Sequence, residues 1–85
     1  MKLAVITGGS GGIGLELARC AARDGYNVLL VASGAERLAA AAEGLRAHHP
    51  SRQIETLVAD LSTAAGVELV GIALADRPVA VLINN

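Results

Sequence analysis

Apolar residues along the chain fall into four short runs, and longer segments with a helical spacing of apolar positions separate these runs. The runs are largely apolar on both faces, as strands inside a parallel sheet are. The segments between them place apolar residues three and four positions apart, which is typical of helices with one buried face. The predicted strands cover residues 2–6, 26–32, 53–59 and 79–83, and the predicted helices cover residues 12–24, 37–47 and 63–75.

The alternation of strands and helices predicts the fold class. The order β-α-β-α-β-α-β with short connections indicates an α/β protein with a parallel sheet, right-handed crossovers and helices on both faces. By analogy with doubly wound folds, we expect a Rossmann-type sheet with strand order 3-2-1-4 in a three-layer α/β/α arrangement. Residues 1–85 leave no room for a second domain.

Residues that commonly begin and end helices stand at the predicted boundaries. Gly25 follows the first helix and suits the left-handed conformation of a C-terminal cap. Ser33 and Glu36 have the spacing of a capping box, so we expect Ser33 to be the N-cap of the second helix. Ser62 or Thr63 can cap the third helix.

The predicted buried face of the first helix carries Ile13, Leu17, Cys20 and Ala21. We therefore expect Cys20 to pack as a small apolar group rather than to act as a reactive thiol. A single cysteine cannot form an intramolecular disulfide, and the sequence lacks the ligand spacing of a zinc site. No metal site is predicted.

Composition limits the classes of function. The chain has 85 residues, a net charge of −1 and no basic stripe. Tyr26 is its single aromatic residue, so it lacks the cationic surface and stacking rings of nucleic-acid-binding proteins. The N-terminus does not resemble a signal peptide, and no apolar run approaches the ~20 residues of a membrane span. We expect a cytoplasmic protein that binds neither nucleic acid nor a membrane.

The segment from Thr7 to Gly14 holds five glycines and joins the first strand to the first helix. An ordinary strand–helix turn needs one or two. Glycine allows positive φ and a close approach of the backbone to a ligand, and the following helix N-terminus offers unpaired N–H groups and a positive dipole end. This segment, called the glycine loop below, is therefore predicted to bind nucleotide phosphates.

The glycine loop fits two patterns. The general dinucleotide fingerprint would begin at Gly9 and would expect an acid at the tip of the second strand. That tip is Ala32 and Ser33, and the capping box already accounts for Glu36, which lies at about the right distance. Gly8 also lies nearer than Gly9 to the end of the apolar strand. The longer pattern Thr-Gly-x-x-x-Gly-x-Gly, which includes Gly8, is therefore preferred.

The longer pattern and its neighbours resemble the short-chain dehydrogenase/reductase family over the entire chain, with the motifs in the family's order and at about its spacing. The matching residues are Thr7-Gly8-x-x-x-Gly12-Ile13-Gly14, Gly25-Tyr26-x-Val28, Glu36-Arg37-Leu38, Asp60-Leu61 and Val81-Leu82-Ile83-Asn84-Asn85. The last of these looks like the start of the family's Asn-Asn-Ala-Gly motif.

The resemblance implies that the glycine loop cradles the phosphates of a dinucleotide cofactor and lets the first helix close on the first strand. The residues that would cradle the adenosine phosphates are Gly8, Gly9, Ser10 and Gly11. Ile13 would pack beside the pyrophosphate. Gly12 and Gly14 would allow the close approach of the helix.

The resemblance also places residues around the adenosine. Asp60 would hydrogen-bond the adenine amino group, Leu61 would lie beside the ring, and Asn85 would lie near the adenosine ribose or the neighbouring backbone. Taken alone, Asp60 could simply end a strand, and Asn84 and Asn85 could form a plain turn.

The tip of the second strand bears on the choice of cofactor. Members of the family that prefer NAD typically carry an acid at this tip, whereas those that prefer NADP often carry an arginine just after it or a basic residue at the position of Gly11. This chain has neither. Without a carboxylate at Ala32 a 2′-phosphate is not repelled, and the Ser33 hydroxyl could donate to it while it caps the helix. The resemblance therefore favours NADP, with NAD as the alternative.

The family's hydride transfer between a nicotinamide and a carbonyl or alcohol substrate uses Ser, Tyr and Lys residues beyond the Asn-Asn motif. Tyr26 is the only tyrosine here, its +4 neighbour is Leu30, and Lys2 is the only lysine. We therefore expect no catalytic residue in this chain. Residues 1–85 are predicted to be the N-terminal, adenosine-binding part of an NAD(P)-binding Rossmann domain, inactive alone.

Two other interpretations accompany this one. The first is a non-catalytic dinucleotide-binding module, complete at 85 residues. The second is a member of the family's extended branch, such as a sugar-nucleotide epimerase, but that branch spaces its glycines as Gly-x-x-Gly-x-x-Gly. In the favoured interpretation the last strand is an exposed edge beside apolar surface, so the isolated chain is expected to be poorly stable or to associate, and a homo-oligomer is expected.

Overall fold

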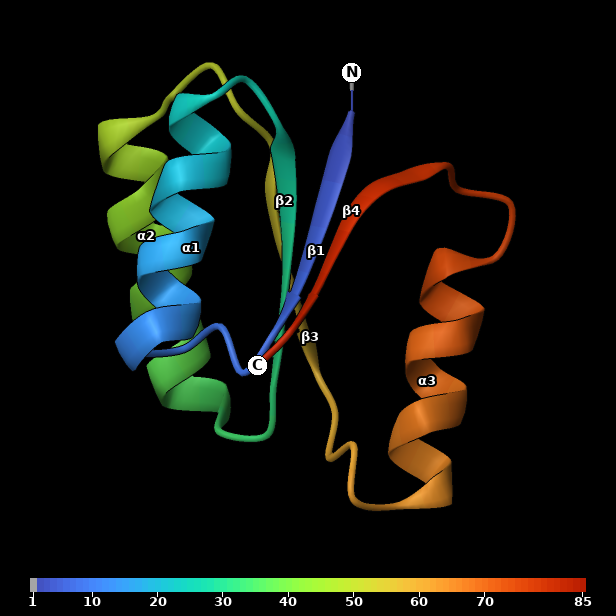
Figure 1. The fold of residues 1–85 in the computed structure, drawn as a ribbon. Helices are drawn as coiled ribbons and strands as arrows, with labels where there is room; N and C mark the ends of the chain where they lie inside the picture. The colour runs from blue at the N-terminus through green and yellow to red at the C-terminus, as the bar shows by residue number, and fades with distance from the viewer. Residues whose placement is uncertain (1) are drawn as a thin grey trace.

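The computed structural model describes residues 2–85, and its elements follow the order that the sequence predicts (Figure 1). Each element lies within two residues of its predicted range. The strands are β1 (Leu3–Thr7), β2 (Asn27–Ala32), β3 (Ile54–Val58) and β4 (Val79–Asn84), and the helices are α1 (Gly12–Arg23), α2 (Ala35–His48) and α3 (Ala64–Leu74).

The four strands form one parallel sheet in the order β3-β2-β1-β4, which confirms the predicted topology. Every residue of β1 is buried, and so is the middle of β2, because each of these strands has neighbours on both sides and helices over both faces. The strands are parallel, so their carboxyl ends meet at one edge of the sheet. That edge holds the glycine loop and the chain's last residue (Figure 1).

Helices cover the two faces of the sheet unequally. Figure 1 shows α1 and α2 together on one face and α3 alone on the other. On the first face, Ile6 and Leu30 pack with Leu38 and Leu45 of α2 in a continuous core. The core of the second face is smaller, and its strand residues are joined by the half-buried side chains of α3. The side with two helices therefore holds most of the packing.

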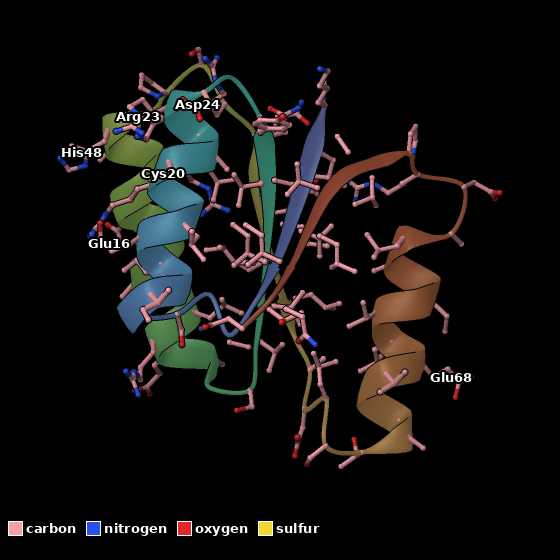
Figure 2. The ribbon with its side chains drawn as sticks, viewed as in Figure 1. Glu16, Cys20, Arg23, Asp24, His48 and Glu68 are labelled. Carbon is pink, nitrogen blue, oxygen red and sulfur yellow. The ribbon has the colours of Figure 1, made fainter. Side chains whose placement is uncertain are left out.

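The buried face of α1 differs from the predicted one. The helix turns small residues toward the sheet, namely Gly14, Ala18 and Ala22 at a spacing of four. Cys20 is exposed, so the expectation that it packs in the core was wrong. Figure 2 places Cys20 on α1 between Glu16 and Arg23. The physical reason is that small residues at these three positions let the helix lie close to the sheet.

The helix caps agree with the sequence in two places and differ in one. Gly25 follows α1 with a φ of +98°, as expected for a residue after a helix C-terminus, and the Thr63 side chain accepts a hydrogen bond from the N–H of Gly66 at 3.0 Å. Ser33 was wrongly predicted as the N-cap of α2. The N-cap is Gly34, without a side-chain hydrogen bond, because the helix begins one residue later than the Ser33–Glu36 spacing requires.

Apolar side chains are exposed on α3 and β4, as the sequence predicts. Ile72 is 67% exposed and Leu82 is 63% exposed. Strand β4 pairs with β1 on one side and forms an edge of the sheet on the other. Glu68 points away from the sheet (Figure 2), so the side of α3 nearer the strands is its apolar one. Across residues 2–85, no helix combines the length and apolarity needed to cross a bilayer.

Candidate functional site

A cavity of about 450 Å³ opens where the carboxyl ends of all four strands meet. Its lining combines the start of the glycine loop, the tip of β2 with the first turn of α2, the segment after β3 and the end of β4. The predicted cofactor-binding residues that line it are Gly8, Ser10, Ser33, Asp60, Leu61 and Asn85. The fold thus brings together residues that lie up to 77 positions apart in the sequence.

The other predicted residues belong to the glycine loop but do not line this cavity. They are Gly9, Gly11, Gly12, Ile13 and Gly14. Gly9 is buried, and a Cβ on it would lie 2.8 Å from the side chain of Leu30. Ile13 is 71% exposed.

The hydrogen bonds of the glycine loop divide it into two parts. The N–H groups of Gly8 and Gly9 both donate to the carbonyl of Val31, at 2.8 and 3.4 Å, and so fasten the loop to β2. They are therefore occupied, in contrast to the expectation that the backbone from Gly8 onward cradles phosphate. The N–H groups from Ser10 to Ile13 take part in none of the backbone hydrogen bonds of the described residues. They lead into the N-terminus of α1, where an anion is favoured.

Two glycines of the loop are required for different physical reasons. A Cβ on Gly14 would lie 2.2 Å from the carbonyl oxygen of Gly8, so this position allows the close approach of α1 to the end of β1, as predicted. Gly12 has open space around it and a φ of +58°. Its expected role in helix closure is therefore wrong, and its requirement for glycine is conformational.

Thr7 fixes the end of β4 against the start of the glycine loop. Its buried hydroxyl donates to Oδ1 of Asn84 at 2.9 Å and accepts the backbone N–H of Asn85 at 3.1 Å. The side-chain amide of Asn85 in turn lies 3.4 Å from the carbonyl of Gly8. The Asn84–Asn85 pair is thus a strand end tied to β1 rather than a plain turn.

Asp60 lies on the opposite side of the cavity, in the turn between β3 and α3. Its Oδ1 accepts both the backbone N–H of Ser62 at 2.9 Å and the Ser62 hydroxyl at 2.6 Å. These hydrogen bonds lower the pKa of the Asp60 carboxyl below its ordinary value. Gly66 of α3 packs directly against this turn. A Cβ on Gly66 would lie 1.8 Å from the Asp60 carbonyl oxygen, so the position has no room for a side chain.

Comparison with known proteins agrees with this geometry. The sequence model of the short chain dehydrogenase family matches residues 2–85. The chain belongs to this family. It is 40% identical over 88 residues to a very-long-chain 3-oxoacyl-CoA reductase of Aspergillus terreus, with 96% of this chain and 24% of that protein aligned. The chain spans about a quarter of the length of the curated relatives it matches.

Solved structures of other short-chain dehydrogenases share the fold. L-sorbose reductase from Gluconobacter frateurii, complexed with NADPH and L-sorbose, superposes with a TM-score of 0.91 at 35% identity and covers 99% of this chain and 32% of its own. A short-chain dehydrogenase from Sphingobium yanoikuyae, in complex with NADPH, has a TM-score of 0.87 at 37% identity and covers 96% of this chain and 32% of its own.

Arg37 also lies at the site of this short-chain dehydrogenase, although it is not among the site residues predicted from the sequence. It lies in the first turns of α2, lines the cavity, and places its Nη2 atom 3.2 Å from the position of a Cβ on Gly11. From the sequence, a basic residue was expected just after the tip of β2 or at the position of Gly11. The signal that could have found Arg37 is its place one helical turn further on, because α2 starts at the edge of the cavity.

Tyr26 and Lys2 lie away from this cavity. Both line a separate small hollow with Asp24 and Gly25. Tyr26 precedes β2 and Lys2 precedes β1, so both stand at the amino ends of parallel strands, opposite the glycine loop. Neither side chain can therefore act on a ligand bound at the carboxyl edge.

Proposed function

We propose that residues 1–85 form the adenosine-binding part of an NADP(H)-dependent short-chain oxidoreductase. The observation that carries the proposal is the cavity at the carboxyl ends of the strands, with the glycine loop on one side and Asp60 and Leu61 on the other. Crevices of this kind, where the strand order reverses between β1 and β4, are where open α/β sheets bind ligands. The NADPH complexes of the two structural relatives support NADP as the cofactor.

Each side of the cavity suits one part of the cofactor. The free N–H groups of Ser10 to Ile13 and the positive end of the α1 dipole suit the pyrophosphate. Asp60 suits the adenine amino group, because Ser62 donates only to Oδ1 and leaves Oδ2 to accept an outside donor. Leu61 lies next to it as an apolar contact for the ring, and Asn85 borders the ribose side.

The reaction that we propose for the full-length protein is hydride transfer between the nicotinamide and a ketone or secondary alcohol. The bound cofactor supplies or accepts the hydride. The relatives support a ketone as the substrate class, because one is named a 3-oxoacyl-CoA reductase and another is an L-sorbose reductase. The residues that protonate the substrate oxygen would lie outside residues 1–85, since Tyr26 and Lys2 stand at the far edge of the sheet.

Cofactor titration of the full-length protein, followed by a turnover assay with a panel of ketones, tests the proposal. We expect saturable binding of NADPH and oxidation of NADPH with one or more ketones. Binding without turnover on any carbonyl or alcohol would favour the non-catalytic dinucleotide-binding module instead. Absence of binding to both NADPH and NADH would overturn the proposal.

A pair of variants links the binding to this cavity. Asp60→Ala is expected to weaken NADPH and NADH binding to a similar extent, by roughly tenfold, since a hydrogen bond to a charged group contributes about 1.5–3 kcal/mol. Glu68→Ala is the matched control, because Glu68 is an exposed acid of α3 that points away from the sheet (Figure 2). It should leave both affinities unchanged.

A further inference from the structure

A second hollow, of about 320 Å³, lies between the two helices that cover the same face of the sheet (Figure 1). Arg19 of α1 lines one side of it, and the end of α2 lines the other side with Gly44, Leu45, His48 and His49. None of these residues lines the cavity at the carboxyl ends of the strands. This hollow, called the helix groove below, is therefore separate from the proposed cofactor site.

Basic side chains gather in the helix groove. Its described lining includes Arg19, His48 and His49 but none of the eight acids of the chain. Glu16, from outside the lining, pairs with Nη1 of Arg19, and no other hydrogen bond or ion pair of the Arg19 side chain is found within residues 2–85. Nε and Nη2 of Arg19 are therefore free to donate to an anion, and a guanidinium suits the oxygens of a phosphate.

One ring nitrogen of His48 is already engaged within α2. Its Nδ1 atom lies 2.9 Å from the carbonyl oxygen of Gly44. A carbonyl oxygen only accepts, so Nδ1 carries the hydrogen, and the neutral ring is left with Nε2 as an acceptor. An anion that contacts Nε2 of the neutral ring must therefore bring a proton with it.

Gly44 has neither a packing reason nor a conformational reason to be glycine. A Cβ on it would meet no atom within 4 Å, and its φ is not among the positive ones. Glycine inside a helix is less favourable than alanine. The missing side chain leaves space in the lining of the helix groove, next to the ring of His48.

The helix groove continues along the two helices over an apolar floor. An adjoining hollow of about 380 Å³ shares Arg19 and His48 with it and adds Leu15, Ala40 and Ala41. It also reaches Ser10 and Arg37, which border the first cavity. Volumes of this size suit small organic ligands. An anion bound between Arg19 and His48 can therefore extend an apolar group along this floor.

We infer that the helix groove binds a phosphate monoester, held by the guanidinium of Arg19 and by Nε2 of His48. This site goes beyond the proposed function and does not depend on it. The contact with His48 holds one proton, which arrives either on the phosphate monoanion or on the ring. With a second pKa of about 6, a phosphate monoester keeps that proton in part near neutral pH, whereas sulfate and carboxylates do not.

Calorimetric titration of the full-length protein with phenyl phosphate at neutral pH tests the inference, with NADPH in excess to fill the first cavity. We expect saturable binding of phenyl phosphate. Arg19→Ala should weaken it by about tenfold or more, and His48→Ala by about two- to tenfold. Inorganic phosphate should bind about two- to tenfold more tightly than sulfate, because sulfate has the same shape but no proton for the neutral ring.

Arg23→Ala is the matched control, because Arg23 is an exposed arginine of the same helix (Figure 2) and lines neither of the two hollows. It should leave phenyl phosphate binding unchanged. Gly44→Leu keeps every charge but fills the helix groove, and leucine favours a helix more than glycine does, so this variant should fold and lose the binding. Arg19 and His48 are exposed, so their variants should keep the melting temperature of the unaltered protein.

A phosphate monoester can reach this site as a soluble compound or as a lipid headgroup. Cosedimentation with phosphatidylcholine vesicles, with and without phosphatidic acid, distinguishes the two sources. Binding of phenyl phosphate in solution identifies a soluble ligand, whereas binding to phosphatidic acid vesicles alone identifies a headgroup, and either must be weakened by Arg19→Ala and His48→Ala.

Three outcomes would overturn the inference. The first is no binding of phenyl phosphate or of phosphatidic acid vesicles to the unaltered protein. The second is binding that Arg19→Ala and His48→Ala leave unchanged, which would place the anion elsewhere. The third is equal affinity for phosphate and sulfate, which would mean that Nε2 of His48 accepts no proton from the ligand and that the helix groove does not select a phosphate.

Discussion

The hydroxyl of Thr7 accepts the backbone N–H of Asn85 at 3.1 Å, and so joins two residues that are 78 positions apart in the sequence. The same hydroxyl donates to Oδ1 of Asn84 at 2.9 Å. Thr7 ends β1 and Asn84 ends β4, and Figure 1 shows the C-terminal residue beside the start of the glycine loop. One buried side chain therefore holds together the ends of two of the strands that border the cavity.

Thr7→Val is expected to lower the free energy of unfolding of the full-length protein by about 1–2 kcal/mol, because the backbone N–H of Asn85 and the side chain of Asn84 both lose the Thr7 hydroxyl as a partner while the shape is kept. Thermal or denaturant unfolding measures this. NADPH affinity should also fall, since Asn85 lines the cavity. Thr7→Ser keeps the hydroxyl and serves as the control, with a loss below about 1 kcal/mol. Equal stability of the Val and Ser variants would contradict this role of the hydroxyl.

The sequence predicted the elements and the sheet order because these depend on strong local signals. The apolar run of β1 is buried along its length and that of β2 in its middle, and turn residues such as Gly25 stand at the helix ends. The Thr-Gly-x-x-x-Gly-x-Gly pattern and the Asn84–Asn85 pair indicated the family. They also predicted which edge of the sheet holds the cavity. Each of these signals lies within a few residues along the chain.

The rest depended on how closely the elements pack. Cys20 was assigned to the buried face of α1 because large apolar residues were taken to mark that face, whereas the close approach of Gly14 to the Gly8 carbonyl selects small ones. Arg37 was missed because its place in the cavity depends on where α2 begins. The helix begins at Ala35, because its N-cap is Gly34 and not Ser33.

Gly66, like Gly14, lies at a position where close packing leaves no room for a side chain. Gly66→Ala is expected to lower the free energy of unfolding by about 1–3 kcal/mol, because the added methyl group would lie 1.8 Å from the Asp60 carbonyl oxygen and must push the turn away. NADPH affinity should fall as well, since this turn carries Asp60 into the cavity lining. Denaturant unfolding and cofactor titration measure the two effects.

Gly71→Ala is the matched control on the same helix. A Cβ on Gly71 has open space around it, so the substitution should raise the free energy of unfolding by about 0.5–1 kcal/mol through the better helix propensity of alanine. If Gly66→Ala behaved like Gly71→Ala, the close contact between α3 and the Asp60 turn would not exist in solution.

The exposed apolar surface predicts how residues 1–85 behave when produced alone. Leu82 on the edge strand β4 is 63% exposed, and Ile72 on α3 is 67% exposed. Such surface beside an unpaired strand edge favours association with another copy of the chain. Sedimentation over a range of concentrations should show concentration-dependent association, and Leu82→Lys should reduce it. A monomer at every concentration with a cooperative melting transition would contradict this expectation.

The Asp60 carboxyl provides a test at acid pH. Its hydrogen bonds from the hydroxyl and the backbone N–H of Ser62 stabilise the ionised form in the folded protein and lower its pKa. Because the folded pKa lies below the unfolded one, the stabilisation is present above the ordinary pKa and is lost as the pH falls through the lowered value. Ser62→Ala removes the hydroxyl donor and keeps the backbone one, so carboxyl carbon NMR should show Asp60 titrating at higher pH in this variant. An unchanged titration midpoint would mean that the Ser62 hydroxyl does not hold the carboxylate in solution.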